Sequence, residues 1–282
     1  AFPTRRAADL FGDDWLFRHL PQEWDIVVTG VMETMRRRGT QPGFGLASED
    51  QEQRRACISF YRHLFEKVSH TNQYFGREKI LAVEIQSAPL AGTANIEEST
   101  RCFSDSLQEI LGWDWPCELI IEHCDALGKP GARKGFLPLE SELAAIAQAK
   151  DQSGKRVGIG INWARSAIEG RSTTLPLEHL HICQQAGALS ALMFSGTTTC
   201  GAYGEWQDLH APFAPFNGSE AGCADSLMTV DKAAEMFSYA PCESLSFAGI
   251  KLLEIDASAS VDHRIAILQD GMKAMNMAIN KK

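Results

Sequence analysis

The sequence predicts an α/β protein in which buried parallel strands alternate with helices throughout a single domain, residues 1–282. Six short apolar runs turn polar at their carboxyl ends, which is typical of parallel strands covered on both faces. Segments with apolar residues at helical spacing separate these runs, and such regular alternation indicates βα units. A (β/α)8 barrel of the TIM type needs about 250 residues, so the chain is long enough for one.

The six expected strands are rich in valine, isoleucine and leucine. They cover 25–31, 80–87, 118–125, 156–164, 189–196 and 247–254. Six strands do not close an eight-stranded barrel, and residues 1–24 carry no strand pattern. We therefore expect a TIM barrel that lacks its first one or two βα units. A doubly wound sheet is the alternative, but its phosphate-binding GxGxxG turn follows none of the six runs.

Five helices are expected between and after the strands. They cover 49–69, 95–111, 139–149, 177–186 and 261–279. In the first of them Ile58, Tyr61, Leu64 and Phe65 recur at the spacing of one helix face.

Composition limits the partners and the compartment. The formal net charge of −9 argues against nucleic acid, which needs a basic surface. No apolar run reaches the roughly 18 residues of a membrane span, so we expect no membrane partner. The eight cysteines form no CxxC pair, which favours free thiols in a reducing compartment and predicts a cytoplasmic protein.

The active site of a TIM barrel forms at the carboxyl ends of its strands, and side chains alternate between the two faces of each strand. Glu84 and Gln86 share one face of the second run. In the third run Glu122 lies on one face and His123 on the other. In the last run the alternation leaves two registers open, one that points Lys251 inward and one that points Glu254 inward.

Glu84 and Glu122 are the most informative of these residues. A carboxylate inside an apolar strand is costly unless it is paired, bound to a metal or kept protonated for catalysis. The alternative is a structural ion pair with an arginine or a lysine such as Lys251.

A long segment with many glycine, proline and aromatic residues, 197–225, follows the fifth run, and a loop of this length is usually functional. Asp208 and His210 are spaced so that both can offer ligand atoms to a divalent ion. The alternative is a solvated loop. His179 and His181 lie two residues apart within a predicted helix and do not share a face, so they predict packing rather than a metal site.

Taken together, the strand ends resemble those of the xylose-isomerase-like TIM barrels. The chain is most similar to an uncharacterised bacterial branch of that superfamily. The shared stretches are FGLAS (44–48), VEIQSAP (83–89), IEHCDA (121–126), KGFLPLE (134–140), INWARSAIE (161–169) and LMFSG (192–196).

The resemblance implies a sugar isomerase or epimerase that uses a divalent ion such as Mn²⁺, Mg²⁺, Zn²⁺ or Co²⁺. Its usual ligands are Glu, Asp, His and Glu. Glu122 and Glu254 match the first and last of these, whereas Asn162 and Ser195 stand where Asp and His are usual. Substitute ligands from the loop complete the predicted metal set, which is Glu122, Asp208, His210 and Glu254.

The chemistry that we expect is proton removal next to a carbonyl group. Glu122 or Glu84 is the predicted base, and Lys251 or a metal stabilises the enediolate oxygen. Imidazole titrates near neutral pH, so His123 and His210 are the predicted proton shuttles. The predicted substrate-binding residues are Gln86, Asn162, Trp163, Ser195 and Trp206.

Other functions stay open on the same scaffold. A sugar lyase or dehydratase needs the same proton abstraction, and a metal-free sugar-binding protein is consistent with Asn162 and Ser195 at the ligand positions. The superfamily also includes a DNA-repair endonuclease, which the acidic net charge disfavours. The expected partners are a carbohydrate and, because such barrels often pair through surface helices, a second copy of the chain.

Overall fold

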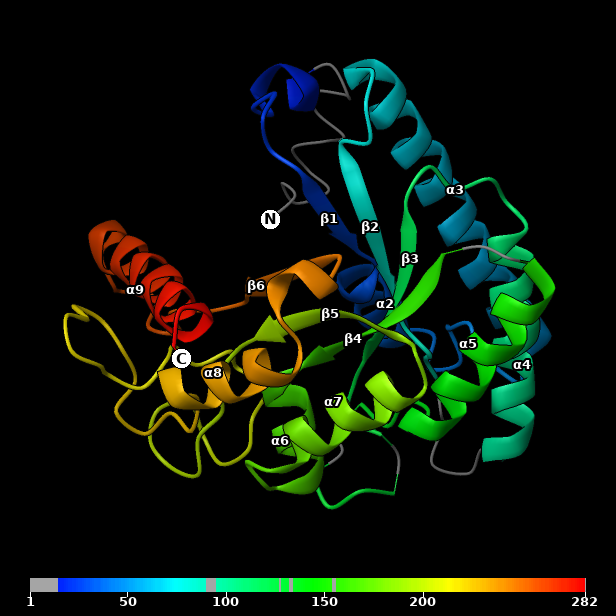
Figure 1. Cartoon of the computed structure of the whole chain (residues 1–282). Coiled ribbons are helices and arrows are strands. Elements are labelled where there is room, and N and C mark those ends of the chain that lie inside the picture. Colours follow the sequence, from blue (N-terminus) through cyan, green and yellow to red (C-terminus); the bar gives the residue numbers. More distant parts are fainter. Residues whose placement is uncertain (1–14, 90–94, 127, 132–133, 154–155, 282) are drawn as a thin grey trace.

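The computed structural model describes residues 15–89, 95–126, 128–131, 134–153 and 156–281. Six parallel strands form one sheet in chain order, and Figure 1 shows them side by side in a curled half-barrel. The strands are β1 (Ile26–Thr29), β2 (Ile80–Ile85), β3 (Glu118–His123), β4 (Val157–Asn162), β5 (Leu189–Phe194) and β6 (Phe247–Ile250). Each strand lies within one of the six apolar runs, so the predicted strands are confirmed.

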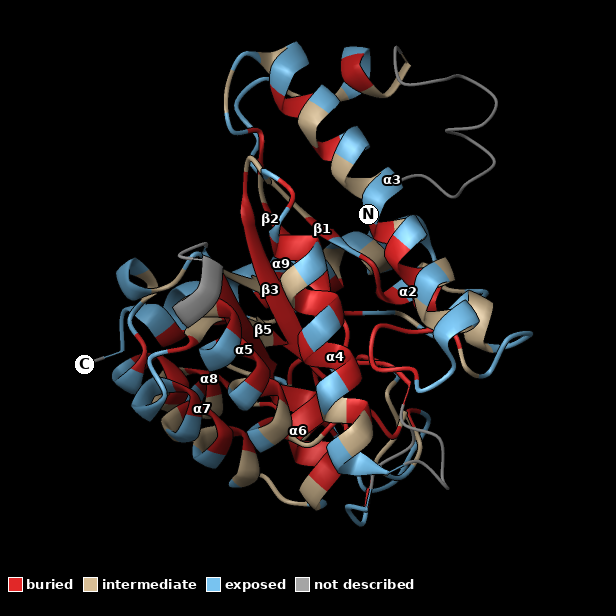
Figure 2. Ribbon diagram, turned by 90° about the vertical axis from the view of Figure 1, so that its right-hand side faces the viewer, coloured by how far each residue is buried: buried red, intermediate tan, exposed pale blue. Residues whose placement is uncertain are grey.

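Helices follow the strands and cover the convex side of the sheet (Figure 1). They are α2 (Val31–Arg38), α3 (Gln51–Phe75), α4 (Ile96–Leu111), α5 (Leu139–Ser153), α6 (Trp163–Gly170), α7 (Leu175–Gln185), α8 (Val230–Tyr239) and α9 (Val261–Ile279), with a 3-10 turn η1 (Cys242–Ser244). Figure 2 shows β2 and β3 buried while the helices expose their outer sides. Within the described residues, no helix is long and apolar enough to span a membrane.

Local signals explain where the helices begin and end. Asp50 accepts hydrogen bonds from the backbone N–H groups of Glu52 and Gln53 and so starts α3. The helix runs past the predicted end at residue 69 and stops at Gly76, whose φ of 64° suits glycine. The last turns bury Thr71 and Asn72 rather than apolar residues, so the apolar periodicity ends before the helix does.

A second difference lies at the end of β4, where the sequence predicts a strand that continues to residue 164. The strand instead ends at Asn162, and α6 begins at once with Trp163. The Asn162 side chain accepts hydrogen bonds from the N–H groups of Ala164 and Arg165. An N-cap of this kind explains the abrupt change from strand to helix.

The two faces of the sheet are packed differently. The outer face joins the helices in the main core, to which Val83, Ile121 and Ile159 belong. On the inner face a small apolar cluster lies near the amino ends of the strands. Its members are Ala82, Ile120 and Ala191, with Val27 and Phe247 packed against them. Residues two positions further along each strand therefore meet above this cluster, at the carboxyl ends.

Gly158 and Gly160 allow the inner face of β4 to pack closely. A Cβ added at Gly158 would lie 1.9 Å from the Ser190 Oγ atom, and one at Gly160 would lie 3.3 Å from Ile120. No larger side chain fits at Gly158 without displacing β5, so this residue serves packing rather than phosphate binding.

All eight cysteines are free thiols, as the sequence predicts. Five of them are buried, namely Cys57, Cys102, Cys117, Cys124 and Cys183. Their burial raises the pKa of each of these thiols, which keeps them protonated at neutral pH.

The segment between β5 and α8 has little regular structure but many specific contacts. Isolated bridges join Gly196 to Ala211 and Thr198 to Ser226. His210 has a positive φ of 53°, which is uncommon for a non-glycine residue. These contacts fold the predicted long loop back over the carboxyl ends of the strands.

Candidate active site

The alternation of side chains brings five polar residues to the inner face at the carboxyl ends of the strands. In β6, Phe247 belongs to the inner cluster, whereas Ile250 and Leu252 pack in the main core. This pattern settles the register of the last run and points Lys251 inward. The inner set is Glu84 (β2), Glu122 (β3), Asn162 (β4), Ser195 (after β5) and Lys251 (after β6).

Glu122 is the centre of this set and is 3% exposed. The Gln86 amide donates a hydrogen bond of 3.2 Å to its Oε2 atom. The Tyr61 hydroxyl in turn donates to the Gln86 Oε1 atom at 3.2 Å, which fixes the orientation of the amide. On its other side, the Lys251 Nζ atom lies 3.9 Å from the Glu122 Oε1 atom. A buried carboxylate is thus held by one neutral donor and one cation.

Glu84 lies on the inner face of the strand next to that of Glu122, and its pKa is strongly shifted. Burial, together with the charge of Glu122, raises the pKa of Glu84 to about 8, although Lys251 and a hydrogen bond with Thr29 act in the opposite direction. Glu84 is therefore mostly protonated at neutral pH. A carboxyl group that holds its proton at neutral pH can act as a general acid.

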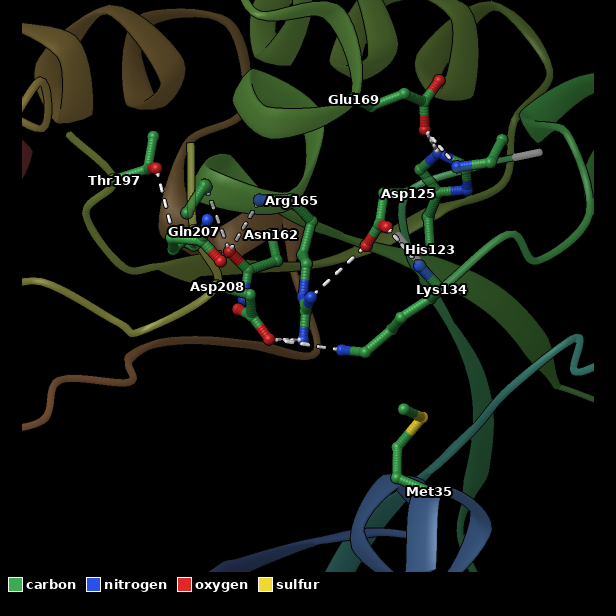
Figure 3. A network of polar contacts seen from close by, with 12 residues as sticks. Met35, His123, Asp125, Lys134, Asn162, Arg165, Glu169, Thr197, Gln207 and Asp208 are labelled. Atoms are coloured by element: carbon green, nitrogen blue, oxygen red, sulfur yellow. Dashed lines mark hydrogen bonds and ion pairs between the residues drawn. The ribbon is translucent and has the colours of Figure 1, made fainter. Parts of the chain in front are cut away.

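A second polar group connects α6 to the long loop and is shown in Figure 3. Arg165, in the first turn of α6, is 3% exposed. One of its terminal nitrogens lies 3.3 Å from the Asp125 carboxylate, and the other forms an ion pair with Asp208. Lys134 reaches the same Asp208 oxygen at 3.3 Å. Asp208 is therefore held between two cations.

His210 completes the loop side of the site. Its Nδ1 atom lies 3.4 Å from the Asp208 Oδ1 atom. Burial lowers the pKa of His210 to about 4; Asp208 and Glu122 oppose this effect, whereas the charges of Lys251 and Arg165 add to it. The imidazole is therefore neutral at physiological pH, and it is buried beside Asp208.

Several polar atoms around this site have no hydrogen-bond partner in the described structure. Of the seven such buried side-chain atoms, four belong to the loop side and the α6 cap. They are Asn162 Nδ2, Arg165 Nε, Asp208 Oδ1 and His210 Nδ1. Buried polar atoms are nearly always satisfied, so their concentration here indicates a place for a polar ligand or water.

The inner strand ends do not fit a divalent ion. Lys251 presents an ammonium group, which cannot be a ligand and repels a cation. The Asn162 Oδ1 atom already accepts hydrogen bonds from Ala164, Arg165 and the Ser195 hydroxyl. Glu122 is the one carboxylate left among the usual ligand positions.

The predicted metal set of Glu122, Asp208, His210 and Glu254 is not brought to one centre. Among the described residues, the one group of three or more ligand side chains within 4.8 Å of one another is His123, Glu169 and His179. Glu254 lies beyond the end of β6, where its carboxylate contacts His263 at 2.9 Å and the backbone N–H of Asp256. The alternation rule does not reach it because the strand has ended.

Three further predicted site residues lie elsewhere. His123 points to the outer face and is buried between Glu142 and Glu169, so it does not reach the inner face as a proton shuttle. Trp163 is 1% exposed in the main core, because α6 begins there. Trp206 is partly buried against the same core, and its backbone N–H donates to Thr198. These contacts do not bring either tryptophan to the inner face, where a substrate would bind.

Sequence reasoning missed Asp125, Lys134 and Arg165. Asp125 is the last residue of the third run, a strand-end position at which the sequence already shows an acidic side chain. Arg165 depends on the start of α6, and Lys134 depends on a partner 74 residues away in sequence. A local sequence pattern does not predict contacts between residues so far apart in the chain.

The amino-acid sequence matches, over residues 2–267, the family described as Domain of unknown function (DUF4862). A protein of Salmonella typhimurium strain LT2, named "Uncharacterized protein STM3670", is 54% identical over 270 residues, which are 96% of this chain and 83% of that protein.

Solved structures match the fold at low sequence identity. A Rhodospirillum rubrum protein provisionally assigned as a xylose isomerase is 12% identical with a TM-score of 0.58, over 84% of this chain and 73% of its own. The IolI protein, whose crystal structure contains a zinc atom, is also 12% identical with a TM-score of 0.55, over 95% and 91% of the two chains. These matches confirm the xylose-isomerase-like TIM-barrel fold, with six strands in the part of the chain that the structure describes.

Proposed function

The chain belongs to the family described as Domain of unknown function (DUF4862), and from its site we propose that it moves a proton next to a carbonyl group of a sugar or polyol, as an isomerase or epimerase. One observation carries the proposal. Two buried carboxyl groups, Glu84 and Glu122, lie on the inner face beside a single ammonium group. The fold that this chain shares with sugar isomerase-like structures supports the substrate class.

In the proposed reaction Glu122 is the base. It removes a proton from the carbon next to the carbonyl group, and the electron pair moves onto the carbonyl oxygen. Glu84 carries a proton at neutral pH, because its pKa is about 8, and donates it to that oxygen. The resulting enediol returns to a carbonyl compound when a proton is delivered to the other carbon or to the opposite face.

Lys251 supplies the positive charge that such a reaction requires. Its ammonium group is 3.9 Å from Glu122 and close enough to Glu84 to lower the pKa of that carboxyl. In this position it stabilises negative charge on the enediolate oxygen. We propose that it does so in place of a divalent ion, since the donor set at the strand ends does not suit one.

The loop side of the site is suited to a polyhydroxylated molecule. Asn162 and Arg165 offer nitrogens that make no hydrogen bond, and Asp208 Oδ1 and His210 Nδ1 face each other at 3.4 Å without forming one. Sugar hydroxyl groups both donate and accept hydrogen bonds, so one substrate can satisfy all of these atoms. We propose that this side orients the substrate while Glu84 and Glu122 carry out the chemistry.

Deuterium exchange tests the proposal even when the identity of the product is unknown. The protein is incubated in D₂O with a panel of aldoses, ketoses and inososes, and mass spectrometry records the gain of one deuterium in recovered substrate or product. We expect exchange with at least one compound and none with Glu122→Gln. The matched control is Glu118→Gln, which alters a carboxyl on the same face of β3 that bonds to Ser190 and Ser246 away from the site.

Exchange by Glu122→Gln at the wild-type rate would remove Glu122 from the base role. Absence of exchange across the panel, with binding of a sugar detected by calorimetry, would instead support a binding protein.

A second candidate is a sugar dehydratase or lyase, and the protonated state of Glu84 favours it. After proton removal by Glu122, an acid with a pKa near 8 can protonate a departing hydroxyl group. The same panel separates the two reactions, because a dehydratase yields an unsaturated or deoxy product that has lost one water.

A further inference from the structure

A buried cluster of histidine and glutamate residues lies outside the active site, on the outer face of the sheet. His123 comes from the end of β3, Glu169 from α6 and His179 from α7. All three side chains are buried, with exposed fractions of 1%, 1% and 4%. Figure 3 shows Glu169 and His123 facing each other, apart from Lys134 and Asp208.

The imidazole Nε2 atoms converge on one carboxylate. His123 Nε2 lies 3.1 Å from Glu169 Oε2, and His179 Nε2 lies 3.7 Å from Glu169 Oε1. The ligand atoms of all three residues are within 4.8 Å of one another. In a tetrahedral zinc site, metal–ligand distances of 2.0–2.2 Å separate neighbouring ligand atoms by about 3.3–3.5 Å. The contacts to Glu169 are close to that spacing.

Both histidines are held at their other nitrogen. His123 Nδ1 contacts Glu142 Oε2 at 2.6 Å, and the second oxygen of Glu142 accepts a hydrogen bond from Ser87. His179 Nδ1 contacts the Ser166 hydroxyl at 2.9 Å. A histidine that binds a metal through Nε2 commonly has its Nδ1 oriented by a carboxylate or another hydrogen-bonding group. Both rings have this arrangement.

The charges of the cluster also favour a divalent cation. Glu142 and Glu169 are two buried carboxyl groups, and neither forms an ion pair with lysine or arginine in the described part of the chain. One divalent ion with two neutral imidazoles would balance two carboxylates. The ion takes the place of the proton shared between His123 and Glu169, and that proton leaves to solvent.

We propose that His123, Glu169 and His179 supply three ligands of a buried zinc site that ties β3 to α6 and α7, with a water molecule in the fourth tetrahedral position. Two nitrogen ligands and a carboxylate suit Zn²⁺ among the common divalent ions. The site adjoins the active site through α6, because that helix carries Glu169 near its end and Asn162 and Arg165 at its start. A bound ion would therefore fix the helix that positions the loop side of the active site.

Zinc content measured by inductively coupled plasma mass spectrometry tests the proposal. The full chain is expressed with added ZnCl₂ and purified without chelator. We expect about one zinc per chain in the wild type and less than a tenth of that in His179→Ala. The matched control is His181→Ala, which removes a histidine of the same helix that packs on Tyr239, and it should keep the zinc.

A second variant keeps the test decisive if His179→Ala does not fold. Ser166→Ala removes the group that orients His179 and should weaken zinc affinity by about 10- to 100-fold in competition with a chromophoric chelator. Wild-type protein that takes up no zinc, even when refolded with ZnCl₂, would overturn the proposal. So would wild-type zinc content in His179→Ala or unchanged affinity in Ser166→Ala.

Discussion

Replacing Glu84 with glutamine should stabilise the protein at alkaline pH. The folded chain holds the Glu84 proton with a pKa of about 8, whereas an ordinary glutamate has a value of 4.5. Because the folded state keeps a proton that the unfolded chain has released, wild-type stability falls as pH rises from about 4.5 to about 8. Glutamine does not ionise, so the stability of the variant does not fall with pH for this reason.

The size of the effect follows from the shift in pKa. A difference of about 3.5 between 8 and 4.5, at roughly 1.36 kcal/mol for each unit, gives an upper limit of about 5 kcal/mol. Lys251 stabilises the ionised form and its side chain is 32% exposed, so water reaches this pair and reduces the value. We expect Glu84→Gln to gain about 2 kcal/mol relative to the wild type between pH 5 and pH 9.

Urea denaturation at a series of pH values measures this gain. The control is Glu66→Gln, which removes an exposed carboxyl from α3 and should not reproduce it. A stability difference between Glu84→Gln and the wild type that is the same at pH 5 and pH 9 would refute the buried, protonated state of Glu84.

Three further predictions concern the neighbours of this residue. Lys251→Met should raise the pKa of Glu84 further above about 8, because the ammonium group lowers that pKa. Carbon NMR of labelled glutamate carboxyl groups measures the pKa, and an unchanged value would mean that Lys251 is too far from Glu84 to affect its charge. Arg165→Met should cost about 3–5 kcal/mol in urea denaturation, since it removes the arginine from the buried Asp125 carboxylate, and a cost below about 1 kcal/mol would contradict the pairing. Gly158→Ala should destabilise the protein by about 1–3 kcal/mol because its Cβ would meet Ser190, and Ser190→Gly should restore part of that loss; no recovery would mean that the clash lies elsewhere.

The strands and half of the candidate site could be predicted from sequence because both depend on local pattern. Buried parallel strands appear as continuous apolar runs, and a period of two then assigns Glu84, Glu122 and Asn162 to one face. The same rule left Lys251 and Glu254 undecided. Packing settled the choice, since Ile250 and Leu252 join the main core and leave Lys251 on the inner face.

The remaining residues depend on contacts between distant segments. Asp208 was predicted as a metal ligand, but the structure gives it Arg165 and Lys134 as partners. The sequence does not show where α6 begins, and so it does not show that Trp163 is buried or that Arg165 reaches the loop. The buried position of His123 on the outer face likewise depends on its contacts with Glu142 and Glu169, which are 19 and 46 residues further along the chain.

The central claim is that Glu84 donates a proton while Glu122 removes one. The pH dependence of deuterium exchange into a substrate tests it most directly. The account predicts that the wild-type rate declines above about pH 8, as Glu84 loses its proton, and that Glu84→Gln is slow with no such decline. A wild-type rate that stays constant or rises from pH 7 to pH 9.5 would contradict it.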